Sequence, residues 1–85
     1  MFLGGTSMKA SQVVAKRIKE LCEENEISYY TLSYKAAISM STLMHAVNGG
    51  NITIKTLNKL CNGLGISLTN FFDTEYFSTC EQEDD

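Results

Sequence analysis

The side chains best suited to binding chemistry follow one another between Ser39 and Asn51, in the segment SMSTLMHAVNGGN. Ser41 and Thr42 carry hydroxyls that donate and accept hydrogen bonds, and the neutral imidazole of His45 does both through its two nitrogens. The segment contains no fixed charge. Its chemistry is therefore hydrogen bonding to the polar edges of a ligand or to phosphate oxygens.

The same residues do not form a catalytic or metal-binding pattern. His45 is the only histidine and has no cysteine or carboxylate at ligand spacing. The odd number of cysteines, Cys22, Cys61 and Cys80, and their wide spacing suit reduced thiols better than a disulfide framework or a zinc motif. The glycine pair that follows is not a phosphate-binding fingerprint. We therefore expect no enzyme activity, no cofactor and no metal.

Two short helices joined by a tight turn would position this segment. The pattern predicts one helix over residues 29–36, capped by Ser28, and a second over residues 40–47, capped by Ser39. Small and apolar side chains at the crossing positions let the two helices pack closely: Leu32, Ser33, Ala36, Ile38, Leu43 and Ala46. This is the helix-turn-helix pattern, which we place at residues 28–48.

Further helices are expected around the motif. Apolar residues recur at helical spacing from residue 10 or 11 to about residue 25. Thr53 caps a fourth helix that ends at Gly63 or Gly65, and Ser67 caps a last one over residues 68–73. The predicted fold class is therefore all-α, a compact bundle of about five short helices.

The chain length of 85 residues suits one small domain. We expect a disordered leader at residues 1–9, the helix-turn-helix domain at 10–77 and an acidic disordered tail at 78–85. No apolar run approaches the roughly 20 residues that span a bilayer, and the start of the chain lacks a secretion signal. The prediction is a cytoplasmic protein without a membrane partner.

The net charge of −3 conceals an uneven distribution. From Asp73 onward there are six acidic residues and no basic residue, so residues 1–72 carry seven basic and four acidic side chains. Within residues 28–51 only Lys35 carries a fixed charge. Because phosphate contacts dominate affinity for nucleic acid, any DNA affinity should be modest and readily weakened by salt. The basic side chains are compatible with a solvated face: Lys16, Arg17, Lys19, Lys35, Lys55 and Lys59.

The order and spacing of these pieces resemble a known family. The pieces are RIKELCEENEIS before the motif, LSYKAAISMSTL in it, NGGN as the following loop, TIKTLNKLCNGLGIS as the next helix and LTNFFDTEYF at the close. From about Val13 to Phe77 the chain is similar to the Cro and lambda-repressor type of helix-turn-helix proteins, often called the Xre family, particularly its short bacterial forms. The resemblance implies a lambda-repressor-like DNA-binding domain.

The resemblance also implies a role for each part of the motif. Tyr29, at the start of the first motif helix, would lie over a phosphate. The first turn of the second motif helix would enter the major groove. Side chains that match base-edge positions are Met40, Ser41, Met44 and His45, and those that match backbone contacts are Ser39 and Thr42. The loop residues would offer amides to the next phosphates: Asn48, Gly49, Gly50 and Asn51.

The chain departs from the family pattern at three places. Ala37 stands at a turn position that is usually glycine, where a left-handed backbone would cost about 1–2 kcal/mol unless the turn relaxes. Cys22 and Val47 match a common arginine–glutamate pair, and this apolar replacement leaves no buried charge unpaired. The loop after the second motif helix lacks the usual lysine, arginine and proline, which removes expected phosphate contacts.

Several motif side chains have two open interpretations. Met40 and Met44 either touch thymine methyls or a protein partner, or at least one of them fills the core. Of the three tyrosines in the first motif helix, at least one is expected to pack, while Tyr29 and Tyr30 can present hydroxyls to DNA. His45 either donates to guanine or a phosphate, or is simply solvated.

Two functional hypotheses follow. The first is a sequence-specific transcriptional regulator, a repressor, that reads the major groove of double-stranded DNA with residues 39–47. It would act as a homodimer with half-sites about 34 Å apart. The second is a protein–protein interaction module of the same fold, antitoxin-like or regulator-binding, which the nearly uncharged, methionine-bearing second motif helix favours. The expected dimer surface is apolar: Leu68, Phe71, Tyr76 and Phe77.

Overall fold

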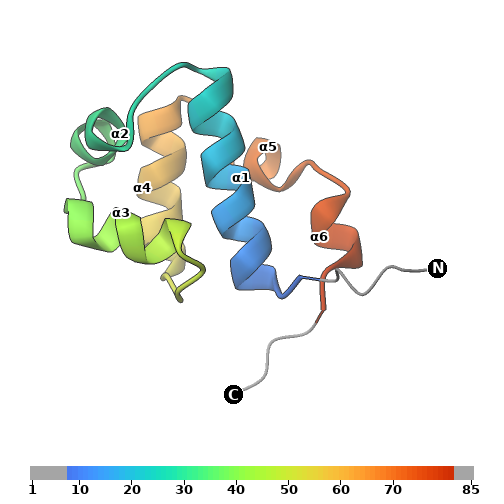
Figure 1. Ribbon diagram of the computed structural model, residues 1–85. Coiled ribbons are helices and arrows are strands. Elements are labelled where there is room, and N and C mark those ends of the chain that lie inside the picture. The colour runs from blue at the N-terminus through green and yellow to red at the C-terminus, as the bar shows by residue number, and fades with distance from the viewer. Residues whose placement is uncertain (1–7, 82–85) are drawn as a thin grey trace.

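The chain folds into a bundle of short helices, as the sequence predicts. The computed structural model describes residues 8–81, and in this range the only regular elements are six α-helices, with one isolated β-bridge beside them. The helices are α1 (Ala10–Glu24), α2 (Tyr29–Ala36), α3 (Met40–Val47), α4 (Ile54–Leu64), α5 (Leu68–Phe72) and α6 (Tyr76–Thr79). Figure 1 shows α2 and α3 on one side of α1 and α4, with α5 and α6 on the other. The predicted all-α fold is confirmed.

Side-chain caps fix where four of the helices begin. Ser28, Ser39, Thr53 and Ser67 precede α2, α3, α4 and α5, and each hydroxyl accepts the N–H of the residue three positions later at 3.0 Å. These bonds satisfy amides that a helix start leaves without a partner. All four predicted caps are confirmed, and those at Ser28 and Ser39 fix where the two motif helices begin.

Left-handed residues end the first four helices. Glu26, Ala37, Gly49 and Gly65 have φ between 54° and 87°, which lets a following amide turn back to a helix carbonyl. At Ala37 the backbone is left-handed, so the turn does not relax. Gly65 rather than Gly63 terminates α4.

The core lies where α1, α2, α3 and α4 meet. Its fully buried members come from every one of these helices and from α5: Ile18, Leu32, Leu43, Leu60 and Phe71. Cys22 and Val47 are buried in the same core, as expected for an apolar replacement of a charge pair. Burial raises the pKa of the Cys22 and Cys61 thiols, which act as small hydrophobic side chains.

The boundaries of the folded part are wider than predicted. Residues 78–81 are not disordered, because α6 continues to Thr79 and the amide of Glu81 donates to the carbonyl of Met8 at 2.8 Å. Lys9, assigned to the leader, forms an ion pair with Glu81 at 3.6 Å. The rest of the predicted leader and tail, residues 1–7 and 82–85, lies outside the described residues. Within the described part, no helix is long and apolar enough to cross a membrane.

Candidate nucleic-acid interface

Helix α3 presents a polar outer face and an apolar inner face. Leu43, Ala46 and Val47 are buried against the bundle, whereas Ser41 and His45 are exposed. This division follows from the helical period, which places residues four positions apart on the same face. The outer face is therefore free to meet a ligand.

The hydroxyls at the start of α3 are organised by the cap. Ser39 accepts the amide of Thr42 at 3.0 Å and donates its own hydroxyl proton to Thr42 Oγ1 at 2.9 Å. The Thr42 hydroxyl keeps its own proton for a further acceptor. The Ser39 and Thr42 side chains are thus hydrogen-bonded to each other at the start of α3.

A groove of about 460 Å³ continues from this pair to the start of α4. Its lining is neutral: Ser39, Ser41, Thr42, His45, Asn51, Ile52, Thr53 and Thr56. The sequence predicts only a capping role for the Thr53 hydroxyl, and no pattern in it indicates Ile52 or Thr56 as groove residues. The predicted cap at Thr53 could have indicated these groove residues, because it places the first turn of α4 directly after the loop that closes α3.

Gly50 determines where the His45 ring lies. A β-carbon at residue 50 would collide with the imidazole, so the ring rests against the glycine backbone. His45 thereby lines the groove beside Ser41 instead of extending along the helix. Since Gly50 has an ordinary φ, the need for glycine here comes from space rather than from backbone conformation.

The predicted role of the loop amides is wrong for three of the four residues. The amides of Asn48, Gly49 and Gly50 donate to the carbonyls of Met44, Ala46 and His45 at 2.9–3.1 Å. These bonds close the end of α3 and leave those amides unavailable to phosphate. The side chains of Asn48 and Asn51 are exposed and remain as hydrogen-bonding groups.

The motif tyrosines and methionines divide between packing and exposure. Tyr29 is half-buried and packs against the core. Burial is the main cause that raises the pKa of its hydroxyl, and the nearby Cys22 and Glu23 act in the same direction. Tyr30 and Tyr34 are 71% and 83% exposed. Met44 packs against the core, whereas Met40 is exposed. One methionine and one tyrosine therefore fill the core, as the packing interpretation required.

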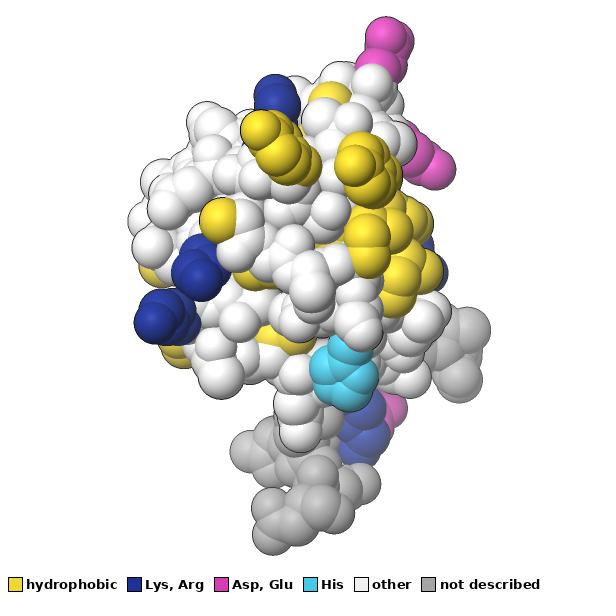
Figure 2. Space-filling model, turned by 90° about the vertical axis from the view of Figure 1, so that its left-hand side faces the viewer, with side chains coloured by type: hydrophobic (Ala, Val, Ile, Leu, Met, Phe, Trp, Pro, Cys, Tyr) yellow, Lys and Arg dark blue, Asp and Glu magenta, His cyan; other side chains and the backbone are white. Residues whose placement is uncertain are grey.

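Charge is sparse on this side of the molecule. Figure 2 views the side on which α2 and α3 lie, and hydrophobic and uncharged side chains cover most of it. The histidine, which is His45, lies among them, and basic side chains lie near the edges (Figure 2). Any contact with an anionic ligand here must rely mainly on neutral donors.

Arg17 does not belong to a solvated basic face. Its guanidinium donates to the carbonyl oxygens of Phe71 and Asn70 at 2.7 Å and 2.9 Å, which joins α1 to the end of α5. Cationic donors suit these positions because the carbonyls at a helix end lack partners. Phe71 is fully buried in this contact region, so the prediction that it contributes to a dimer surface is wrong.

A comparison with protein families identifies the fold. Residues 17–75 match the model of the Cro/C1-type HTH DNA-binding domain. The chain belongs to this family. The match confirms the resemblance to Cro and lambda-repressor proteins, and it covers the motif, the groove and the C-terminal half of α1. The Cro/C1-type family is a class of DNA-binding regulators rather than of enzymes. No curated protein sequence gives a significant match.

Solved structures of similar fold include the wild-type restriction-modification controller protein C.Esp1396I, with 26% identity and a TM-score of 0.71 over 81% of this chain and 90% of that one. A mutant of C.Esp1396I bound to its highest-affinity operator site has 26% identity and a TM-score of 0.73, covering 81% and 91% of the two chains. Prophage Lp1 protein 11 has 28% identity and a TM-score of 0.72, covering 79% and 91%.

Proposed function

We propose that this Cro/C1-type domain is a sequence-specific transcriptional regulator that represses transcription by occupying an operator. The observation that carries the proposal is the outer face of α3, whose Ser41 and His45 side chains border a neutral groove reaching the start of α4. An α-helix with short polar side chains on one face fits the major groove, where base edges offer hydrogen-bonding groups. The operator-bound structure of the similar C.Esp1396I supports double-stranded DNA as the ligand.

The interface divides into base contacts and backbone contacts. Ser41, His45 and the exposed Met40 meet base edges, the methionine through a thymine methyl. Hydroxyls around the helix starts and the loop carboxamides hold the backbone: Tyr29, Tyr30, Ser39, Thr42, Asn48, Asn51, Thr53 and Thr56. Gly49 and Gly50 allow close approach of the DNA without donating their amides.

A dimer is the expected working form. One α3 reads about half a turn of the major groove, so two copies would read half-sites about 34 Å apart on a two-fold-related operator. The half-exposed Phe72 is a better candidate for the dimer surface than the buried Phe71. A dimer also doubles the number of neutral contacts, which compensates for the small charge of each interface.

Selection from a random-sequence duplex library tests the proposal. We expect enrichment of a palindromic site, and a Ser41→Ala, His45→Ala double variant should bind it at least tenfold more weakly, since good base contacts contribute about 1–3 kcal/mol each. The control is an Asn62→Ala, Thr69→Ala double variant, because both side chains are exposed and neither lines the groove. Absence of an enriched site, or equal losses in both double variants, would refute base reading by α3.

A second candidate function is a protein–protein interaction module. The exposed Tyr30, Tyr34 and Met40 favour it, because aromatic and methionine side chains are enriched in protein interfaces. One variant distinguishes the two candidate functions when its protein binding and its DNA binding are both measured. A Tyr34→Ala variant that loses a co-purifying protein but retains the enriched DNA site would assign this patch to a partner protein.

A further inference from the structure

The two ends of the described chain form a unit outside the family match. The family model covers residues 17–75, so the first turns of α1 and all of α6 lie beyond it. These parts contact each other: the Lys9 ammonium pairs with Glu81 at 3.6 Å, and the Lys16 ammonium lies 4.1 Å from the centre of the Tyr76 ring. Tyr76 also donates its hydroxyl to Glu20 at 3.0 Å. Helix α6 and Glu81 are thus held against α1 and the residue before it.

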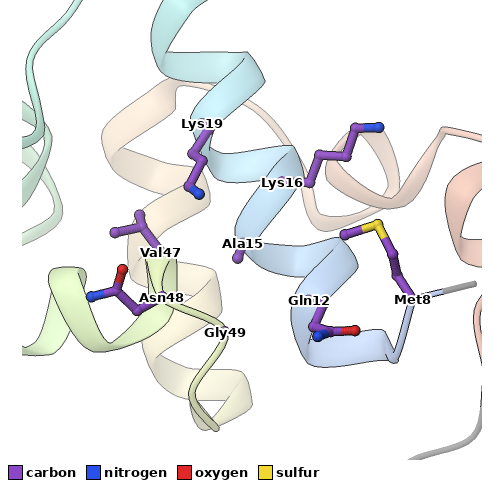
Figure 3. Close-up of a pocket in the computed structure, with 8 residues that line it drawn as sticks. All are labelled: Met8, Gln12, Ala15, Lys16, Lys19, Val47, Asn48 and Gly49. Carbon is purple, nitrogen blue, oxygen red and sulfur yellow. The ribbon is translucent and has the colours of Figure 1, made fainter. Parts of the chain in front are cut away.

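Helix α1 and Met8 just before it form one wall of a cleft of about 410 Å³. Met8, Gln12, Ala15, Lys16 and Lys19 line the α1 side. The opposite wall is the end of α3, with Val47, Asn48 and Gly49 (Figure 3). The cleft is open, and it adjoins Asn48, the exposed residue that caps the C-terminal end of α3.

Of the two lysines that line this cleft, Lys19 is the one whose ammonium can contact a ligand there. Figure 3 shows its side chain extending from α1 toward the end of α3, whereas Lys16 extends to the other side of the helix, where the Tyr76 ring holds it. No carboxylate lines the cleft. Lys19 also borders a second cleft that contains Glu23, Glu26 and Tyr29. It therefore stands between the start of α2 and the end of α3.

We propose that this cleft binds a backbone phosphate of the DNA that α3 reads, with the Lys19 ammonium as the charged contact and the Asn48 carboxamide as a hydrogen-bond donor. The inference rests on the proposed function and extends the interface beyond residues 28–51. That motif has only Lys35 as a fixed charge, yet phosphate neutralisation supplies much of the affinity of DNA-binding proteins. Lys19, beside the end of α3, supplies the positive charge that the motif lacks.

The phosphate assignment follows from the chemistry of the lining. Lys19 offers a point charge and Asn48 a neutral donor, and neither is matched to a particular base edge. Such contacts fix the position of a protein on the duplex without reading its sequence. We therefore expect this cleft to change affinity and its salt dependence, while the enriched sequence stays the same.

The test measures binding to duplex DNA over a range of salt concentrations for wild type, Lys19→Gln, Asn48→Ala and the control Lys59→Gln. Lys59 carries the same charge on α4 and lines neither the cleft nor the groove. Lys19→Gln should lower the slope of log K against log salt by about 0.9 for each protomer and weaken binding severalfold. Asn48→Ala should weaken binding with an unchanged slope. Thermal melting of each variant verifies that it is folded.

The outcomes separate this inference from the proposed function. Equal slopes for Lys19→Gln and Lys59→Gln overturn the phosphate contact even when the wild type enriches a site. If no site is enriched, the slopes on random-sequence duplex still decide the contact, whereas absence of any duplex binding overturns both proposals. Amide shifts at Asn48 and Gly49 that appear with duplex but not with inorganic phosphate support the DNA backbone as the source. Equal shifts with inorganic phosphate refute that source.

Discussion

The turn between α2 and α3 contains a strained residue whose replacement should stabilise the protein. Ala37 has φ 58° and ψ 43°, and its left-handed backbone lets the amide of Ile38 donate to the carbonyl of Ser33 at 3.0 Å. A side chain with a β-carbon pays about 1–2 kcal/mol for this conformation, which glycine adopts freely. Glycine in turn loses about 0.4–1 kcal/mol through the greater entropy of the unfolded chain.

The net expectation for Ala37→Gly is a gain of about 0.5–1 kcal/mol in the free energy of unfolding. For a domain of this size the melting temperature should rise by roughly 2–8 °C. Gly65→Ala is the matched control, because Gly65 ends α4 with φ 74° and a β-carbon there would meet no atom within 4 Å. It should lose about as much as Ala37→Gly gains, through the backbone alone.

Thermal and urea unfolding of the two variants provide the measurement. A destabilised Ala37→Gly protein with a destabilised Gly65→Ala protein would refute the strain argument at the motif turn and leave it valid at the end of α4. Retention of DNA binding by Ala37→Gly is also expected, since glycine adopts the native turn and leaves the orientation of α3 unchanged. Loss of binding at full stability would show that Ala37 restricts the motif more than its geometry indicates.

Three further substitutions test packing, groove geometry and capping. Gly63→Ala should cost about 1–3 kcal/mol in urea unfolding, because its β-carbon would lie 2.9 Å from the backbone nitrogen of Ala36; unchanged stability would contradict close packing of α2 on α4. Gly50→Ala should keep its melting temperature but bind the selected DNA site as weakly as His45→Ala, since the new methyl displaces the imidazole. Wild-type affinity of the Gly50→Ala variant would contradict the idea that DNA reading requires the His45 ring to lie against residue 50. Ser39→Ala should cost about 1 kcal/mol in thermal unfolding through loss of the α3 cap, and a neutral result would exclude that contribution.

Much of the fold was predictable because its signals are local. A serine or threonine cap precedes each of four helices, and the apolar period within each helix then selects the buried face. The predicted bounds of α2 and α3 agree with the structure, and those of α1 and α5 differ by about one residue. Caps and periods depend on neighbouring residues only, so one sequence is enough to read them.

The parts that were missed depend on contacts between distant residues. Helix α6 has four residues and no side-chain cap, and it is held by the ring of Phe77 against Phe72 and by Tyr76 against α1. Its partners in α1, Lys16 and Glu20, are more than 50 positions away in the chain, and no local pattern indicates them. The engagement of the loop amides was missed for a different reason. The glycine pair indicated a helix end, but only the structure shows which carbonyls those amides reach.

The distribution of cations explains how this domain would bind DNA with so little charge at its motif. Of seven basic side chains, Lys9, Lys16 and Arg17 are engaged with α5, α6 or Glu81. These three positive charges thus hold the terminal helices in place, and the α3 face carries hydroxyls, one imidazole and carboxamides. Neutral hydrogen bonds to bases lose little to salt, whereas phosphate contacts lose much. In place of the salt-sensitive binding expected from the sequence, we therefore expect a shallow salt dependence for each protomer, to which Lys19 contributes most. The affinity should then depend on two protomers reading the operator together.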